Sequence, residues 1–253
     1  MYQRIAVGGD NEALLNRLAQ AAKGSRTILF PIHAGQIPPP GTAAVAVPAE
    51  AFGPALDSIL AVGAEQEELL YLLADAVDCR ESIPLGSARR FREHATRFAR
   101  AVNLSLEDQF VLERATILRD IGKIRLSNEL LLKSSVLDYD EWMLLKAHSH
   151  LGAELLRERN VSADVADIVQ YHHECYDGDG YPEHLEKDAI PLLARMLRII
   201  DVYCAMTSPR HYRVSLATHE QGVEYLVKER GKHFDPALVD AFIKANVGHT
   251  AAP

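Results

Sequence analysis

Cysteine is scarce in this chain of 253 residues, and its placement excludes a disulfide framework. The three cysteines, Cys79, Cys175 and Cys204, are odd in number, and no two of them form a CxxC pair. Small domains that are held together by disulfides carry even sets of cysteines at regular spacings. We therefore expect reduced thiols and a cytoplasmic protein.

Long apolar runs are also missing. The N-terminal run in MYQRIAVGGDNE is too short for the apolar region of a signal peptide. The most apolar longer window, residues 43–64, is interrupted by Pro48, Glu50, Pro54 and Asp57. A helix needs about 20 apolar residues to span a bilayer, so we expect a soluble protein with no membrane insertion.

Positive charge is in deficit, with a formal net charge of −8 at pH 7. Proteins that bind nucleic-acid polymers usually carry a basic face, so the sequence argues against such a partner. A local basic pocket for a small anion stays open. The remaining composition, 48% hydrophobic and 25% charged, is that of an ordinary globular protein with a sizeable core.

Residues 1–62 predict a small α/β N-terminal domain, whose role no motif indicates. RIAVGG and RTILFPI read as strands, and Asp10 and Gly24 are suited to begin and end a helix between them. Residues 63–80 predict a connecting helix with leucines at helical spacing. That helix can pair with its own copy in a homodimer or pack onto its own domain, and the pattern fits both.

Residues 81–253 predict a helical domain. Apolar residues recur at helical spacing in the windows 87–104, 106–122, 138–159, 162–174, 191–206 and 219–230. The segments between them, such as YDGDGYPEHL and TSPRHYR, carry glycine, proline or polar residues. The predicted fold class is therefore mainly α, a helical bundle preceded by the small α/β domain.

The helical region also carries residues that can ligate a metal ion. They are Asp120, His148, His172, His173 and Asp201. Imidazole and carboxylate ligands together suit iron, manganese or zinc. Each residue alone also has a structural explanation, which for an isolated pair of histidines is the stronger one, and a metal-free domain whose histidines are only hydrogen-bonded stays open.

Other residues of this region are suited to binding phosphate. Lys123 follows Asp120 closely, and Arg210, Tyr212 and Arg213 lie in SPRHYR. Solvated surface arginines explain the latter segment equally well. The glycines of YDGDGYP, directly after the paired histidines, allow a backbone to approach a ligand closely.

Taken together, these segments resemble the HD-GYP family, a branch of the HD-domain phosphohydrolases that typically hydrolyses cyclic di-GMP. The resemblance covers roughly residues 66–245. It rests on DIGKI (120–124), HSHLG (148–152), HHECYDGDGYP (172–182), DVYCAMTSPRHYR (201–213) and GKHFDPALVDAF (231–242). It implies an HD-GYP-type helical bundle for this region.

The resemblance further implies a dinuclear metal centre bridged by Asp120. One metal would be held by Asp120, His148, His172 and His173, all of which are present. The other would be held by Asp120, Asp201 and two histidines. In this sequence Arg119 and Ser87 stand at the places of those histidines, and Ile83 stands where some relatives have a glutamate that binds a third metal.

Arg119 and Ser87 change what the site can bind. A guanidinium has no lone pair to donate and stays protonated, and a serine hydroxyl is a poor ligand for a divalent ion. We therefore expect no second metal and at most one ion, iron or manganese rather than zinc. A planar guanidinium can instead bridge carboxylates, so Arg119 is expected to replace part of the charge of the missing metal beside Asp120 and Asp201.

The resemblance and these losses together favour a degenerate HD-GYP protein of cyclic di-GMP signalling that is inactive or very slow. Such a protein would bind the nucleotide or dock a partner, for example a GGDEF-domain protein. The docking loop would be formed by Gly178, Gly180, Tyr181 and Pro182. The alternative is a residual metal-dependent cyclic di-GMP phosphodiesterase with a mononuclear centre, in which Lys123 takes part in catalysis. Hydrolysis of another phosphate ester is a third reading.

Overall fold

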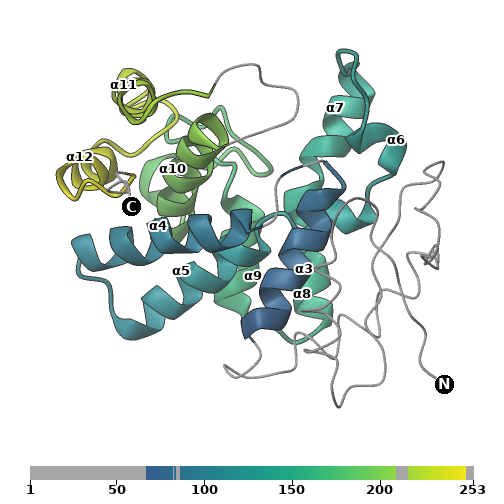
Figure 1. The fold of residues 1–253 in the computed structure, drawn as a ribbon, viewed down its shortest axis with the longest axis horizontal. Coiled ribbons are helices and arrows are strands. Elements are labelled where there is room, and N and C mark those ends of the chain that lie inside the picture. The colour runs from purple at the N-terminus through teal and green to yellow at the C-terminus, as the bar shows by residue number, and fades with distance from the viewer. Residues whose placement is uncertain (1–66, 82, 84–85, 209–215, 249–253) are drawn as a thin grey trace, which may run out of the picture.

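The computed structural model describes residues 67–81, 83, 86–208 and 216–248, and these form a bundle of helices (Figure 1). The predicted N-terminal α/β domain and Arg210, Tyr212 and Arg213 lie outside the described residues. In chain order the elements are α3 (Glu67–Cys79), α4 (Ser87–Ala101), α5 (Leu106–Leu118), the 3-10 helix η2 (Ile121–Arg125), α6 (Asn128–Leu131), α7 (Tyr139–Lys146), α8 (His148–Glu158), α9 (Ala163–Tyr171), the 3-10 helix η3 (Lys187–Ala189), α10 (Leu192–Thr207), α11 (His219–Lys228) and α12 (Pro236–Lys244).

The mainly helical fold expected for residues 81–253 is confirmed over the described part of the chain. Within those residues the β-structure consists of isolated bridges, such as the one between Asp177 and Glu186. None of the described helices is long and apolar enough to cross a membrane.

Several helices begin where the local sequence supplies a cap. Ser105 accepts a hydrogen bond from the backbone N–H of Asp108 at the start of α5. Asp138 and Glu141 form a reciprocal capping box at the start of α7. These side chains satisfy backbone donors that the first turn of a helix leaves without a partner. Their positions explain why the predicted and observed helix starts agree closely.

The helix that was expected as a connector is part of the core. In α3 the side chains of Leu70, Leu72, Leu73 and Val77 are each at most 2% exposed. They belong to the core, in which α3 contacts α4, α5 and η2; Figure 1 shows α3 beside α4 and α5. Of the two explanations that the leucine pattern allowed, packing onto its own domain is the one that the structure shows for these residues.

The window 138–159, expected as one helix, is divided at Ala147. This residue is both the C-cap of α7 and the residue before α8. The ring of His148 bonds to the carbonyl oxygen of Leu145 (Nδ1 to O, 2.7 Å), which satisfies a carbonyl group at the break. The 3-10 helices and the four-residue α6 were not expected, because so short an element shows no hydrophobic period.

Candidate metal centre

Most of the candidate metal ligands lie at helix ends that meet at one place in the bundle. Asp120 lies between α5 and η2, His148 begins α8, and His172 and His173 directly follow α9. One ligand atom from each of the three histidines lies within 4.8 Å of the others. The Nε2 atom of His148 is 3.5 Å from Oδ1 of Asp120. The structure thus brings together four side chains that are spread over about 50 positions of the sequence, from Asp120 to His173.

Close backbone packing holds Asp120 beside α8. Gly122 in η2 lies against the backbone of His148 and Gly152, and a Cβ atom at Gly122 would overlap the carbonyl oxygen of His148. Only glycine leaves room for this approach. The glycine of DIGKI therefore sets the distance between the aspartate and the histidines.

Two of the histidines are oriented as metal ligands usually are. The Nδ1 atoms of His148 and His172 lie 2.7 and 2.6 Å from the carbonyl oxygens of Leu145 and Val169. A metal-ligating histidine typically donates its other ring N–H to such an acceptor. Nε2 of His172 is buried and has no hydrogen-bond partner among the described residues. The donor set therefore fits one divalent cation in residue type and position.

Burial favours the neutral form of these rings. It lowers the pKa of His172 to about 4, and it also lowers the pKa values of His148 and His173. A neutral imidazole is the form that ligates metal ions. The lowered pKa values therefore favour neutral rings, which have lone pairs available for a cation or for one another.

A guanidinium occupies the other half of the expected dinuclear site. Arg119 is 2% exposed, and its Nη2 lies 3.4 Å from Oδ2 of Asp120 while its Nε lies 3.2 Å from Oδ1 of Asp201. Its Nη1 donates to the carbonyl oxygen of Thr116, and its Cζ lies 3.7 Å from the centre of the Phe91 ring. The bridge between the two carboxylates, expected from the sequence, is present in the structure.

The charge of this guanidinium is firmly held. Burial alone would lower the pKa of Arg119, but the surrounding carboxylates raise it above the ordinary value for arginine. Burial alone would likewise raise the pKa of Asp120, but Lys123 and Arg119 lower it well below its usual range. A cation that cannot give up its proton therefore lies between the carboxylates, and this position does not fit a second metal ion.

The two other positions at which the resemblance places metal ligands are buried as well. Ser87 opens α4 and is 1% exposed, and Ile83 is 8% exposed with its backbone N–H bonded to the carbonyl oxygen of Asp78. Neither side chain adds a ligand that could compensate for the missing imidazoles.

Lys123 is already paired with carboxylates. Its Nζ lies 2.6 Å from Oε2 of Glu81 and 3.2 Å from Oδ1 of Asp120, and its side chain is 12% exposed. Burial alone would lower the pKa of Lys123, but these carboxylates raise it. In this structure the ammonium therefore neutralises the aspartate that the histidines face.

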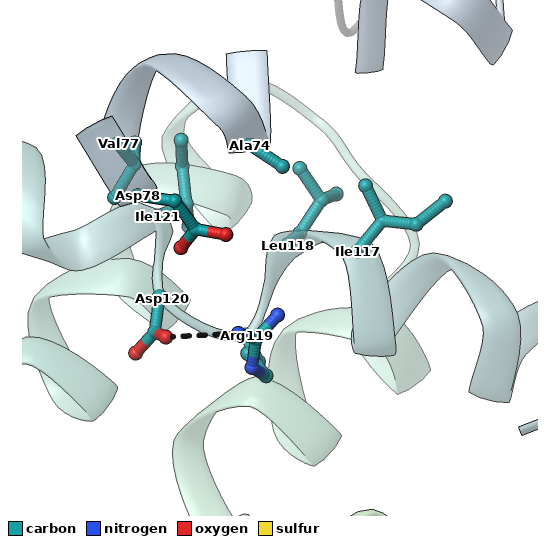
Figure 2. A pocket seen from close by; sticks show the side chains of 8 residues that line it. All are labelled: Ala74, Val77, Asp78, Ile117, Leu118, Arg119, Asp120 and Ile121. Atoms are coloured by element: carbon teal, nitrogen blue, oxygen red, sulfur yellow. Dashed lines mark ion pairs between the residues drawn. The ribbon is translucent and has the colours of Figure 1, made fainter. Parts of the chain in front are cut away.

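Sequence reasoning missed one buried acid of this region. Figure 2 shows Asp78 of α3 in a narrow cavity that also contains Arg119 and Asp120. Burial raises the pKa of Asp78 to about 7, and its Oδ2 has no hydrogen-bond partner among the described residues. An acidic residue inside the apolar run of α3 was the signal that could have revealed it.

Hydrogen bonds to Glu174 and ring stacking on His173 hold the expected docking loop beside the histidine cluster. The carboxylate of Glu174 accepts hydrogen bonds from the backbone N–H groups of Glu183 and Leu185. The Tyr181 ring stacks on the His173 ring, with centroids 4.8 Å apart.

The remaining loop positions differ in their packing. Gly180 is buried against the backbone of Glu174 and Cys175, Gly178 has a φ of 88°, and Pro182 is half-buried after a cis peptide bond. The exposed part of this loop consists of acidic and histidine side chains, namely Asp177, Asp179, Glu183 and His184.

The fold and the site together define a helical domain built around a candidate metal centre. The family model described as HD domain matches residues 71–238, so this chain belongs to the HD domain family. The match begins inside α3, in agreement with the burial of that helix. The resemblance noted from the sequence motifs is confirmed at this level.

The relatives agree with the HD-GYP branch. The chain is 36% identical to the cyclic di-GMP phosphodiesterase response regulator RpfG of Xanthomonas campestris over 75% of its own length and 50% of the relative's. It is 33% identical to the 3'3'-cGAMP-specific phosphodiesterase 2 of Vibrio cholerae over 70% of its own length and 34% of the relative's. The chain thus spans a third to a half of these curated relatives.

The solved structures agree in fold. A cyclic GMP-AMP phosphodiesterase of Vibrio cholerae, V-cGAP3, superposes with a TM-score of 0.55 at 21% identity, over 70% of this chain and 47% of the other. Bd1817 of Bdellovibrio bacteriovorus, described as an HDG"Y"P protein, gives a TM-score of 0.55 at 14% identity, over 78% of this chain and 67% of the other. At these identities the likeness concerns the helical architecture.

Proposed function

We propose that this chain is an HD-GYP domain that binds a cyclic dinucleotide and hydrolyses it very slowly or not at all. One observation carries the proposal: the buried guanidinium of Arg119 contacts both Asp120 and Asp201. Two-metal phosphodiester hydrolysis needs cations on both the attacking and the leaving oxygen. A guanidinium supplies positive charge at one of these places but generates no hydroxide.

The ligand class is transferred from the relatives. Relatives that match most of this chain are named as phosphodiesterases of cyclic di-GMP or 3'3'-cGAMP. Both ligands are cyclic dinucleotides with two phosphodiester groups. We propose cyclic di-GMP as the first ligand to test and a GGDEF-domain protein as a partner of the loop around Tyr181, in the cytoplasm. A homodimer and a sensory role for residues 1–62 belong to the same proposal.

A single metal ion remains compatible with the site. Asp120, His148, His172 and His173 would hold it, and their imidazole and carboxylate groups suit iron or manganese. When bound, such an ion polarises a phosphate oxygen.

The test separates binding from cleavage. Calorimetry would measure cyclic di-GMP and 3'3'-cGAMP binding to the natural protein in the presence of a chelator. Cleavage would be followed by chromatography after loading with Fe(II) or Mn(II) under anaerobic conditions. A Ser87→His/Arg119→His double variant, which restores both lost imidazoles, is the matched comparison. We expect binding without cleavage by the natural protein, and metal-dependent cleavage by the double variant.

A second candidate function is a residual phosphodiesterase with a mononuclear centre. The buried, partnerless Nε2 of His172 beside Asp120 and His148 favours it. Cleavage by the natural protein that requires Mn(II) or Fe(II) and disappears with a chelator would establish this function. It would also overturn the argument from Arg119.

A further inference from the structure

The guanidinium of Arg198 contacts His173 on the ring nitrogen that points away from the histidine cluster. Arg198 of α10 places its Nη1 3.2 Å from Nδ1 of His173 and its Nη2 3.6 Å from the Sγ atom of Cys175. A guanidinium has only N–H donors and no acceptor. Nδ1 of His173 must therefore accept the hydrogen bond, so the proton of this neutral ring is on Nε2.

The other two rings have the opposite tautomer. Nδ1 of His148 and Nδ1 of His172 each face a backbone carbonyl oxygen, which can only accept. Both rings therefore carry their proton on Nδ1 and present a lone pair on Nε2. This is the arrangement in which a histidine ligates a metal through Nε2.

The contact between two Nε2 atoms agrees with this assignment. Nε2 of His173 lies 3.1 Å from Nε2 of His148, a distance at which an N–H of one ring can donate to the lone pair of the other. Only His173 has a proton to give there. The lone pair of His148 that would face a metal is therefore already used by the N–H group of His173.

We propose that Arg198 holds His173 in the Nε2–H tautomer and so disfavours a divalent metal at the cluster. Binding through Nε2 of His173 would require its ring proton to move to Nδ1, where it would point at the guanidinium without an acceptor. Like charge adds to this effect, because a dication at the cluster would lie near Arg198. Within the described residues the side-chain contacts of Arg198 are with His173 and Cys175, its Nε has no hydrogen-bond partner, and no carboxylate forms an ion pair with it.

Arg198 is therefore a positioning residue that acts on the metal site through His173. Arg119 thus occupies the second expected metal position, whereas Arg198 acts on a ligand of the first. The inference builds on the proposed function, since both describe a site adapted to work with little or no metal. Metal affinity is measured without nucleotide, so the two proposals can fail separately.

The first experiment compares Mn²⁺ affinity of the natural protein with that of Arg198→Gln and Arg198→Lys by calorimetry. The glutamine oxygen can accept an N–H from Nδ1 of His173, whereas lysine keeps a positive, donor-only group. Partners of metal ligands typically change affinity by about 10–100-fold. We expect Arg198→Gln to bind Mn²⁺ at least about tenfold more tightly and Arg198→Lys to stay near the natural protein.

Two outcomes would overturn the proposal: unchanged Mn²⁺ affinity in a folded Arg198→Gln variant, or equal gains in the glutamine and lysine variants. Circular dichroism and thermal melting establish that each variant is folded. A second measurement uses the natural protein and does not depend on any variant's folding. Long-range ¹H–¹⁵N NMR spectra of the metal-free protein should show the proton of His173 on Nε2, and a proton on Nδ1 would contradict the inference.

Discussion

Replacing Arg119 by methionine should strongly destabilise the protein. Methionine fills similar volume but removes the cation that contacts Asp120 at 3.4 Å and Asp201 at 3.2 Å. Breaking a buried pair by removing one partner costs about 3–5 kcal/mol, because a buried charge is left uncompensated. Here two carboxylates lose the same partner, so we expect a loss in the upper part of this range.

The matched control is Arg125→Met. Arg125 also contacts two carboxylates, those of Glu154 and Glu158, but its side chain is 31% exposed and theirs are 44% and 50% exposed. Exposed ion pairs contribute about 0–1 kcal/mol, because water screens the charges and ordering the side chains costs entropy. The two variants thus differ in burial while sharing the residue type and the number of partners.

Thermal unfolding followed by circular dichroism, in the presence of a chelator, would measure both variants. For domains of this size, about 2–4 °C of melting temperature corresponds to 1 kcal/mol. Arg119→Met should therefore melt roughly 8–20 °C lower than the natural protein, and Arg125→Met within roughly 4 °C. Equal, small losses in both variants would refute the view that Arg119 stabilises the pocket in place of a metal.

Two further predictions concern residues around this pocket. Burial raises the pKa of Asp78 from 3.8 to about 7, so the unfolded chain loses this proton more readily than the folded protein does. The free energy of unfolding should therefore fall as the pH rises from about 4 to about 7, and it should stay low above pH 7. In the Asp78→Asn variant this fall in the free energy of unfolding should be smaller by up to about 4 kcal/mol, so the variant should be more stable than the natural protein at pH 8. Denaturant titrations that give parallel pH profiles for the two proteins would contradict this. Gly122→Ala should lower the free energy of unfolding by about 3 kcal/mol or more, because the new Cβ overlaps backbone atoms of His148 and Gly152. A variant that melts at the same temperature as the natural protein would show that η2 can move away from α8.

Local sequence determined most of the helices and the chemistry of the ligands. The 3.6-residue period predicted the windows of α4, α5, α9, α10 and α11, because one face of each helix must be apolar to pack. Arg119 excluded a metal ligand at its position by residue type alone, since a guanidinium has no lone pair.

Only the tertiary structure decided which groups meet. Arg119 and Asp201 are separated by 82 positions, and the packing of α5 and α10 brings them into contact. A periodic pattern identifies the buried face of a helix but not its partner, so it revealed neither Asp78 beside Arg119 nor Arg198 beside His173. The tautomers of the histidines likewise depend on which carbonyl or guanidinium lies at each ring nitrogen, and folding alone determines that.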